Sequence, residues 1–358
     1  MRPLNISILY DAIDDDERDK QIKAEGKAPP LMHEVLGQVL GPMGHRVKVL
    51  KARDVLGLTK LLAEDDSDLV FNVCEGFAGV GHHEQHVAAL LELFGKRFTG
   101  AGAIGLSLAG DKALAKKLLA FHGINTPRFS VMQAGSVDHA DDLTFPMFVK
   151  PSNSDASIGI DQRSVVNNFK ELMERISYIQ NEFNAPALIE EFIDGREIYV
   201  SLLQGEKLEA LPIVEWDFSK VPAGTARIAS AEAKWDENSV AFRDAKEVIA
   251  RDLPDFVELA LKEAALEAFR SLKLRDYGRI DMRLRRREPA NDAELATLKS
   301  DAAKQAAREG WELFIIEVNP NPHLATDSEF PMAGKAAGLS YPQLIARIVE
   351  SALTRDQR

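Results

Sequence analysis

Apolar and polar positions alternate between strand-like and helix-like spacing in the N-terminal part of the chain. Short apolar runs at 5–10, 46–50 and 68–73 predict β-strands, and the helical spacing of 31–40 separates the first two. Strands separated by helices are typical of a parallel sheet. Residues 11–30 are dense in Asp, Glu and Lys and end in two prolines, so we expect a mobile, solvated connector there.

The pattern then becomes helical and afterwards returns to strands. Apolar residues from 87 to 94 recur with helical spacing until Gly95, and Asp111 is placed to cap a second helix over 112–119. The charged, Ala-rich stretch 285–310 is predicted to be a helical surface insertion. The remaining strands are expected at 146–149, 187–192, 198–203, 207–214, 278–284 and 313–318, and the remaining helices at 166–179 and 256–272.

The composition indicates a globular protein of more than one domain. The chain has 358 residues, of which 45% are hydrophobic and 28% charged, so we expect two or three domains. The net charge of −12 and the pI near 5.3 disfavour nucleic-acid and membrane partners, because phosphate backbones and anionic lipids repel negative charge. The sequence offers no apolar run long enough for a signal peptide or a membrane span, so we expect a cytoplasmic location. Cys74 lies in an apolar stretch and is expected to be a small buried side chain.

Two strand-like segments near the C-terminus carry the strongest chemical signal. Because side chains alternate along a strand, Arg279 and Asp281 share one face of the first segment. By the same rule Glu317 and Asn319 share one face of the second. If the strands are neighbours, Asp281, Glu317 and Asn319 converge as oxygen ligands of the kind that suits magnesium. The alternative is an ordinary strand pair with a solvated face, but the prolines after Asn319 end the strand where a site would lie.

Two further segments suit a nucleotide. Lys150 ends an apolar strand, and the following loop of small polar residues, which includes Ser157, offers backbone N–H groups to phosphates. This loop does not have the Walker A pattern. Downstream, Glu190, Glu191 and Glu197 stand beside apolar residues, where a strand edge can hold an adenine through its backbone and a ribose through Glu197. A solvated edge strand would have a similar pattern.

These motifs follow one another in a fixed order along the chain. The order is Asp111-Lys112, Val149-Lys150-Pro151, Ile189-Glu190-Glu191, Glu197, Gly278-Arg279-Ile280-Asp281 and Glu317-Val318-Asn319. It resembles the ATP-grasp superfamily and, within it, the D-alanine–D-alanine ligases. The likeness covers about 84–348 and is far more specific than any single motif.

The resemblance implies an α/β (α+β) ATP-grasp fold with an N-terminal Rossmann-like pre-ATP-grasp domain. It divides the chain into an N-terminal domain at 1–105, a central ATP-grasp subdomain at 106–188 and a C-terminal subdomain with the metal site at 189–358. ATP would lie between the last two with two Mg²⁺ ions, for which Mn²⁺ is an alternative. Small carboxylate and amine substrates and a homodimer are also implied.

The same resemblance implies a role for each motif. Asp281, Glu317 and Asn319 would bind the metal ions, and Arg279 would stabilise the oxyanion formed when an amine attacks an acyl phosphate. Among the nucleotide-binding residues, the two lysines would contact phosphates, Glu190 and the backbone near Ile193 the adenine, and Glu197 the ribose. The nucleotide-binding set is Lys112, Lys150, Ser157, Glu190, Glu191, Ile193 and Glu197.

Two more residues match the family near the substrates. Lys234 lies in the polar stretch 222–239 and corresponds to a lysine that reaches the active site from a closing loop. Ser328 corresponds to a serine that helps to hold the carboxylate of the second amino acid. Together they imply an amine substrate that also carries a carboxylate. Each residue has a plain alternative as a surface side chain.

The chain departs from the family pattern around the first substrate. Typical members have a Gly-rich motif with a glutamate that receives the substrate ammonium, whereas residues 11–17 here are mainly acidic. A serine and a tyrosine linked to that glutamate correspond to Ala156 and Trp235, and His323 replaces a glycine. Several changes around one pocket indicate a first substrate other than D-alanine.

A histidine-rich segment offers a metal-binding alternative. His82 and His86 would share one face of a helix, with His83 between them. The spacing is not that of a His-Glu-x-x-His zinc motif, so we interpret these residues as polar groups on the substrate side.

The sequence therefore predicts an ADP-forming carboxylate–amine ligase that makes an amide or peptide bond through an acyl phosphate. Within this class the alternatives are a D-alanine–D-alanine ligase of cell-wall synthesis and a ligase with less familiar substrates. A catalytically silent nucleotide-binding regulator belongs to another class. Arg279 disfavours the regulator, because nucleotide binding alone does not require it.

Overall fold

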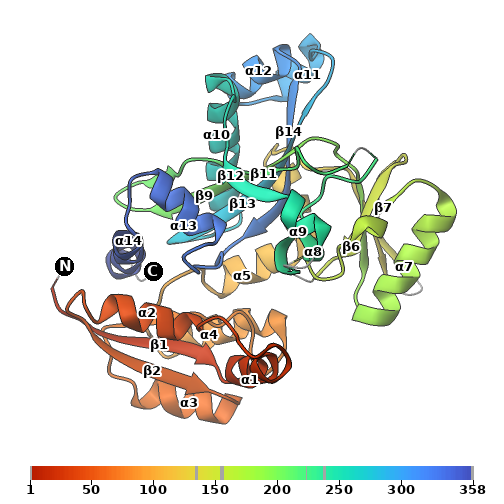
Figure 1. Cartoon of the computed structure of the whole chain (residues 1–358). Coiled ribbons are helices and arrows are strands. Elements are labelled where there is room, and N and C mark those ends of the chain that lie inside the picture. Colours follow the sequence, from red (N-terminus) through yellow and green to blue (C-terminus); the bar gives the residue numbers. More distant parts are fainter. Residues whose placement is uncertain (1, 134–135, 154–156, 223, 237–238, 356–358) are drawn as a thin grey trace.

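The computed structural model describes residues 2–133, 136–153, 157–222, 224–236 and 239–355. In these ranges the strands form three sheets that follow one another along the sequence (Figure 1). No helix within them combines the length and apolar character that crossing a membrane would require.

The N-terminal sheet is parallel, as the alternating pattern predicts. Its middle strand β1 (Asn5–Asp11) lies between β2 (Arg46–Ala52) and β3 (Leu69–Asn72). Apolar side chains of α2 (Met32–Leu40) pack on one face, and the other face is covered by α3 (Val55–Glu64) and α4 (Glu84–Leu93). Cys74 is buried near this sheet, as expected.

The expected mobile connector at 11–30 is wrong, because most of it is helix α1 (Ile13–Glu25). This helix has almost no apolar stripe, so its periodicity gave no signal. Acidic residues in its first turn suit the positive end of the helix dipole, and Gly26 ends it in the left-handed conformation. An ion pair of 2.8 Å between Arg18 and Glu34 ties α1 to α2.

The middle sheet is antiparallel and follows two helices. Asp111 caps the second helix by accepting a hydrogen bond from the backbone N–H of Leu114 at 3.0 Å, as predicted. The helix before it had no counterpart among the predicted elements. The elements are α5 (Ala103–Gly110), α6 (Lys112–Phe121), β4 (Phe129–Gln133), β5 (Ser136–Ala140), β6 (Met147–Pro151), β7 (Val165–Val166), α7 (Phe169–Phe183) and β8 (Ala187–Glu191), with strand order β5-β4-β8-β6-β7.

The third and largest sheet carries most of the strands expected in the second half of the chain. The single strand predicted at 207–214 is wrong, because Pro212 has no N–H for a continuous ladder and the segment divides into two strands. The strands are β9 (Arg196–Gln204), β10 (Leu208–Ala210), β11 (Val214–Asp217), β12 (Lys246–Ile249), β13 (Tyr277–Arg286) and β14 (Trp311–Asn319), in the order β12-β11-β9-β13-β14 with β10 on β9.

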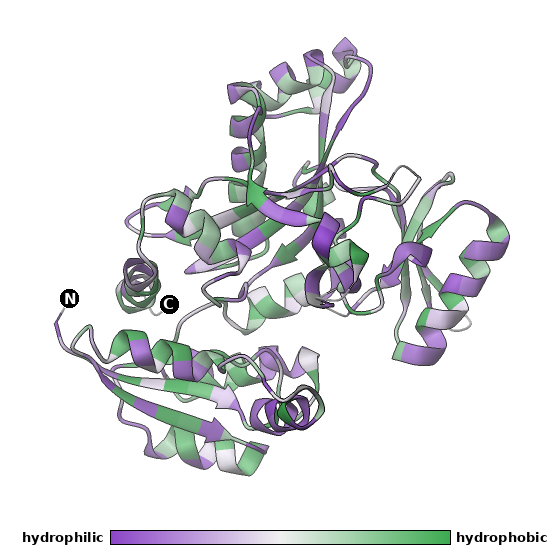
Figure 2. Ribbon diagram, in the orientation of Figure 1, coloured by the Kyte–Doolittle hydropathy of each residue, from purple (hydrophilic) through white to green (hydrophobic). Residues whose placement is uncertain are grey.

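The two faces of this large sheet differ in polarity. Ile280 and Met282 of β13 join a core with Ile198 of β9 and the apolar side of α10 (Asp255–Ser271). Along α10, hydrophobic and hydrophilic positions alternate with the helical repeat (Figure 2). The opposite face of the sheet carries charged side chains. The predicted helical insertion at 285–310 consists of α11 (Asp292–Thr297) and α12 (Asp301–Arg308), and α12 packs against α10.

The C-terminal helices join the large sheet to the N-terminal sheet. Apolar residues of α14 (Tyr341–Thr354) share one core with Ile6 and Ile8 of β1, and α13 (Glu329–Ala336) lies beside them. Asp276 strengthens this junction by accepting hydrogen bonds from Ser351 and from the backbone N–H of Gly100. Since β8 belongs to the middle sheet, we propose three domains with the second boundary after β8.

Candidate active site

The charged face of the large sheet brings the predicted metal ligands onto adjacent strands. Asp281 on β13 lies opposite Tyr199 on β9 and Glu317 on β14, and Arg279 lies opposite Asn319. Register partners project from the same face of a sheet. The expected pairing of the two strands is confirmed, and the oxygen donors of Asp281, Glu317 and Asn319 share one side of it.

Arg279 is the most heavily paired cation of this face. Its Nε and one terminal nitrogen donate to the two carboxylate oxygens of Asp281 at 2.7 and 2.9 Å. The other terminal nitrogen lies 3.2 Å from Glu329 at the start of α13, and the guanidinium stands 4.5 Å from the ring centre of Tyr199. Burial opposes the charged form of Arg279, but Asp281 and then Glu329 raise its pKa well above the ordinary value.

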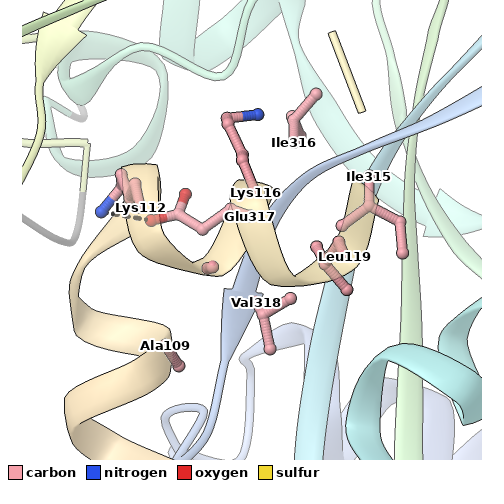
Figure 3. Close-up of a pocket in the computed structure, with 9 residues that line it drawn as sticks. Ala109, Lys112, Lys116, Leu119, Ile315, Ile316, Glu317 and Val318 are labelled. Carbon is pink, nitrogen blue, oxygen red and sulfur yellow. Dashed lines mark ion pairs between the residues drawn. The ribbon is translucent and has the colours of Figure 1, made fainter. Parts of the chain in front are cut away.

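The carboxylates of Asp281 and Glu317 have different partners. Burial raises the pKa of Asp281 to about 6, against the effect of Arg279 and with a contribution from Glu317. Glu317 forms an ion pair of 2.8 Å with Lys112 (Figure 3). Burial would raise the pKa of Glu317, but Lys112 and Lys150 reverse this and hold it at about 2. Glu317 is therefore charged at neutral pH.

The donor chemistry of this face fits a hard divalent cation. Asn319 has a buried Nδ2 atom without a hydrogen-bond partner in the described part of the chain, which fits a side chain held in place for its amide oxygen. Within the same residues no three His, Cys, Asp or Glu side chains are grouped as a metal site. A cation would thus use two carboxylates and an amide, and Glu317 would have to exchange Lys112 for it.

A buried triad lies beside this row of side chains. Glu190 on β8 forms ion pairs with Lys116, at 2.5 Å from one carboxylate oxygen, and with Lys150, at 2.8 Å from the other. Lys150 also donates to the carbonyl of Ile316 at 3.4 Å, next to Glu317. Lys150 and Glu190, both predicted to contact the nucleotide, are therefore in contact with each other. The carboxylate of Glu190 is paired with lysines of the chain.

Lys116 was not identified from the sequence. It lies one helical turn after Lys112, on the buried side of α6, and lines a small cavity with Lys112, Glu317 and Ile316 (Figure 3). Burial lowers the pKa of Lys116, although Glu190 acts in the opposite direction. The available signal was a second lysine on the apolar stripe of the predicted helix.

Glu197 is satisfied by the chain itself. Its carboxylate accepts Tyr199 at 3.0 Å, Arg283 at 2.5 Å and the backbone N–H of Ala229 at 3.3 Å. Ser157 donates to the carbonyl of Ala229 at 3.0 Å, so the loop after Lys150 touches the same segment.

The other two nucleotide candidates are placed differently from each other. Ile193 is buried. Glu191 is half-buried and forms ion pairs with Arg285 at 2.9 Å and with Arg128 at 3.6 Å. Its carboxylate is therefore paired with arginines and is not part of the triad of Glu190, Lys116 and Lys150.

The two predicted substrate-side residues make different contacts. Lys234 on the short helix α8 (Ala231–Trp235) stands 5.7 Å from the ring centre of Tyr199, over the same ring as Arg279. Ser328 precedes Glu329, and its hydroxyl lies 2.8 Å from the carbonyls of both His323 and Ala325. Lys234 thus joins the Arg279 cluster, whereas the hydroxyl of Ser328 bonds to backbone.

Ala156 and Trp235 are two of the departures from the family pattern. Ala156 lies outside the described residues, and Trp235 is the last residue of α8. In the acidic segment, Asp15 pairs with Lys51 and receives the hydroxyl of Tyr10 at 2.9 Å. For Asp14, burial, and then Asp11 and other carboxylates, raises the pKa to about 7.

Histidines of two other loops lie near β3 of the N-terminal sheet. His323 lies 3.8 Å from Glu75, which follows β3. His83 contacts the carbonyl of Phe77 at 3.2 Å, and its ring packs near those of His82 and His86. These three histidines therefore form one cluster beside the end of β3.

Comparison with known proteins identifies the family. The model described as D-ala D-ala ligase C-terminus matches residues 118–298, just over half of the chain. The chain belongs to the D-alanine–D-alanine ligase family. Among relatives of this ligase-family chain, a Sinorhizobium fredii protein, y4sG, is 32% identical, with 81% of this chain and 76% of the relative covered. A D-alanine–D-alanine ligase from Bordetella petrii is 30% identical, covering 81% and 78%.

Solved structures of the family share the fold. A D-alanine–D-alanine ligase from Bacillus anthracis matches with a TM-score of 0.69 at 21% identity, covering 98% of this chain and 97% of the other. The structure of the Bacillus anthracis ligase complexed with ATP matches with a TM-score of 0.65 at 20% identity over the same shares. The predicted ATP-grasp fold is thereby confirmed for this family member.

Proposed function

We propose that this chain is an ATP-dependent carboxylate–amine ligase. A carboxylate oxygen of the first substrate attacks the γ-phosphorus of ATP, which gives an acyl phosphate and ADP. The amine nitrogen then attacks the acyl carbon, phosphate leaves, and the nitrogen loses a proton to give an amide. The observation that carries this proposal is the convergence of Lys112, Lys150, Asp281 and Glu317 with Arg279, since phosphoryl transfer needs cations and metal-binding oxygens together.

The lysines would hold the triphosphate. Lys150 is fixed by Glu190, and Lys112 lies against Glu317, so two cations face the oxygen donors from α6 and β6. With Ser157, Glu191, Ile193 and Glu197 they would form the nucleotide site between the middle and the large sheet. The similar ligase structure from Bacillus anthracis is complexed with ATP, which supports ATP as the nucleotide.

Asp281, Glu317 and Asn319 would hold two Mg²⁺ ions, with Mn²⁺ as an alternative. Bound there with ATP, magnesium would neutralise the charge that spreads over the phosphate oxygens during transfer. The neighbouring carboxylates of Asp281 and Glu317 support a cation between them, because the charge of Glu317 opposes the ionisation of the buried Asp281.

Arg279 and Lys234 would act on the acyl group. A guanidinium held by Asp281 is oriented before the reaction, which is the condition under which a cation stabilises a developing oxyanion effectively. Lys234 comes from the segment after β11 and lies 5.7 Å from the ring centre of Tyr199. It would therefore bring a second cation to the acyl group. A regulator that only binds a nucleotide would not need this second pair of cations.

We further propose that the first substrate is not D-alanine. The acidic segment that would receive its ammonium uses Asp15 for Lys51 and Tyr10, and Asp16 for Arg53 at 2.9 Å. Asp14 is a half-buried carboxyl with a pKa raised to about 7, and a proton on it would remove the charge that an ammonium needs. The relatives named as D-alanine–D-alanine ligases make D-alanine the obvious compound to test.

The test is formation of ADP and phosphate from ATP and magnesium with a panel of carboxylates and amines, followed by mass spectrometry of the product. We expect ADP formation to require both an acid and an amine, and to be absent with D-alanine alone. Rapid D-alanyl-D-alanine synthesis at millimolar D-alanine would refute the substrate assignment. Nucleotide binding without turnover for every pair would favour the regulator.

A further inference from the structure

Glu329 occupies the one side of Arg279 that Asp281 leaves open. Two guanidinium nitrogens donate to Asp281, and the third lies 3.2 Å from a carboxylate oxygen of Glu329. Both side chains of this ion pair are about nine-tenths buried, at 10% and 11% exposure. Every nitrogen of Arg279 therefore already faces a carboxylate that belongs to the chain.

A second glutamate holds Glu329 in this position. Glu247 on β12 lies within hydrogen-bonding reach of Glu329, where a proton on one carboxyl group stabilises the charge of the other. Burial, and then the charge of Glu329, raises the pKa of Glu247, so Glu247 is the partner that keeps the proton. Burial acts against ionisation of Glu329 too, but Arg279 and Lys234 lower its pKa and keep it charged.

The cluster over Tyr199 is consequently balanced in charge. Arg279 and Lys234 are positive, Asp281 and Glu329 are negative, and Glu247 holds a proton. A carboxylate of the amine substrate, which the resemblance places at Ser328, would meet the charge of the adjacent Glu329 in a buried position, where like charges repel strongly. An uncharged group would enter without that cost.

We propose that Glu329 is a specificity-determining residue whose buried charge, next to Ser328, excludes a carboxylate on the amine substrate, so that this substrate carries no carboxylate next to its amino group. The inference rests on the proposed ligase function and deepens it. The amine substrates would then be primary amines such as amino acid amides, amino alcohols and alkylamines. This substrate class differs from the amino acid that Lys234 and Ser328 imply by resemblance. Negative selection by a like charge is a general route to specificity.

The experiment compares matched amines with whichever carboxylate supports ADP formation. Glycine is paired with glycinamide, and D-alanine with D-alaninamide, at a pH where both amino groups are supplied at equal concentration of free amine. For the wild-type enzyme we expect kcat/KM to be about tenfold or more higher for the amide of each pair. A preference for the amino acid in wild type would overturn the inference, and this comparison needs no variant.

Glu329→Gln tests the residue itself, because it removes the charge and keeps the shape. We expect the preference for the amide to fall at least several-fold, mainly through a lower KM for the amino acid, while ADP formation with the amide remains measurable. The control is Glu209→Gln, which removes an exposed carboxylate paired with Arg347 at 2.9 Å on the same sheet. An unchanged amide preference in Glu329→Gln, in a variant that still turns over, would overturn the role of Glu329.

The outcomes separate this inference from the proposed function. If no acid and amine pair gives ADP, the ligase proposal fails. If ADP forms and amino acids are the better amines, only the assignment of Glu329 fails.

Discussion

The Nζ atom of Lys116 lies 2.5 Å from Oε1 of Glu190, and both side chains are only 3% exposed. The other oxygen of Glu190 receives Lys150 at 2.8 Å. One buried carboxylate thus pairs with two lysines, of which Lys150 would contact ATP. Lys116 supplies the second positive charge that keeps Glu190 ionised, since burial alone would favour its neutral form.

Replacing Lys116 by Met should destabilise the protein and weaken nucleotide binding together. Loss of one partner leaves buried charge uncompensated, which typically costs about 3–5 kcal/mol. Urea unfolding and calorimetry with ATP would measure the two effects. Lys117→Met is the matched control, because the next lysine forms an exposed pair with Asp138 at 2.8 Å and should change stability by less than about 1 kcal/mol. Equal stability of the two variants would show that Lys116 is not needed for Glu190.

Replacing Lys150 by Ala should weaken ATP binding and should also lower stability, because Glu190 loses one of its two buried lysine partners. A charge-assisted contact to a phosphate contributes about 1.5–3 kcal/mol, so the affinity should fall by roughly one to two orders of magnitude. Isothermal titration with a non-hydrolysable ATP analogue would measure this. Lys170→Ala on α7, a lysine in an exposed pair with Glu174, should bind the nucleotide as wild type does. Unchanged affinity in Lys150→Ala would remove Lys150 from the nucleotide site.

Replacing Glu317 by Gln should abolish turnover. A neutral amide of the same shape cannot balance divalent cations, and it also releases Lys112. The melting temperature without ligand should stay within a few degrees of wild type, while magnesium-dependent ADP formation disappears. Glu312→Gln on the same strand, where Glu312 pairs with Arg285 at 2.8 Å, serves as the control. Near wild-type activity of Glu317→Gln at saturating magnesium would refute the metal site.

The sequence was most informative where alternation along a strand decides which side chains meet. Strand periodicity placed Asp281 with Arg279, and Glu317 with Asn319, and the observed pairing of β13 with β14 brings the two pairs together. Helix α1 was missed because surface charges and tertiary ion pairs stabilise it, not an apolar stripe.

Residues recruited from other elements were beyond the reach of the sequence. Glu329 and Glu247 are separated along the chain and come together only when α13 packs against β12, which no local pattern encodes. Lys116 is intermediate between the two cases. Its position on the buried side of α6 was readable, but its partner Glu190 on β8 was not.

Stability should respond to pH through Glu247. Burial and the charge of Glu329 raise its pKa from 4.5 to about 8 in the folded protein. Below pH 4.5 the group holds a proton whether the chain is folded or unfolded. Between these two values the folded protein keeps a proton that the unfolded chain releases, so the free energy of unfolding falls as pH rises, by at most about 1.4 kcal/mol per pH unit. Above pH 8 both states are ionised and this loss levels off.

Glu247→Gln should remove this dependence, because the amide mimics the protonated acid and can still donate to Glu329. Urea unfolding of both proteins at pH 5, 6, 7 and 8 would therefore give curves that diverge, with the variant gaining stability over wild type at each step. The sign distinguishes this from the removal of an ordinary surface carboxylate, which leaves the difference between the curves constant over this range. Parallel curves would mean that Glu247 ionises at its ordinary pH and that Glu329 holds no shared proton. The balanced charge around Arg279 would then be lost as an explanation for amine selection.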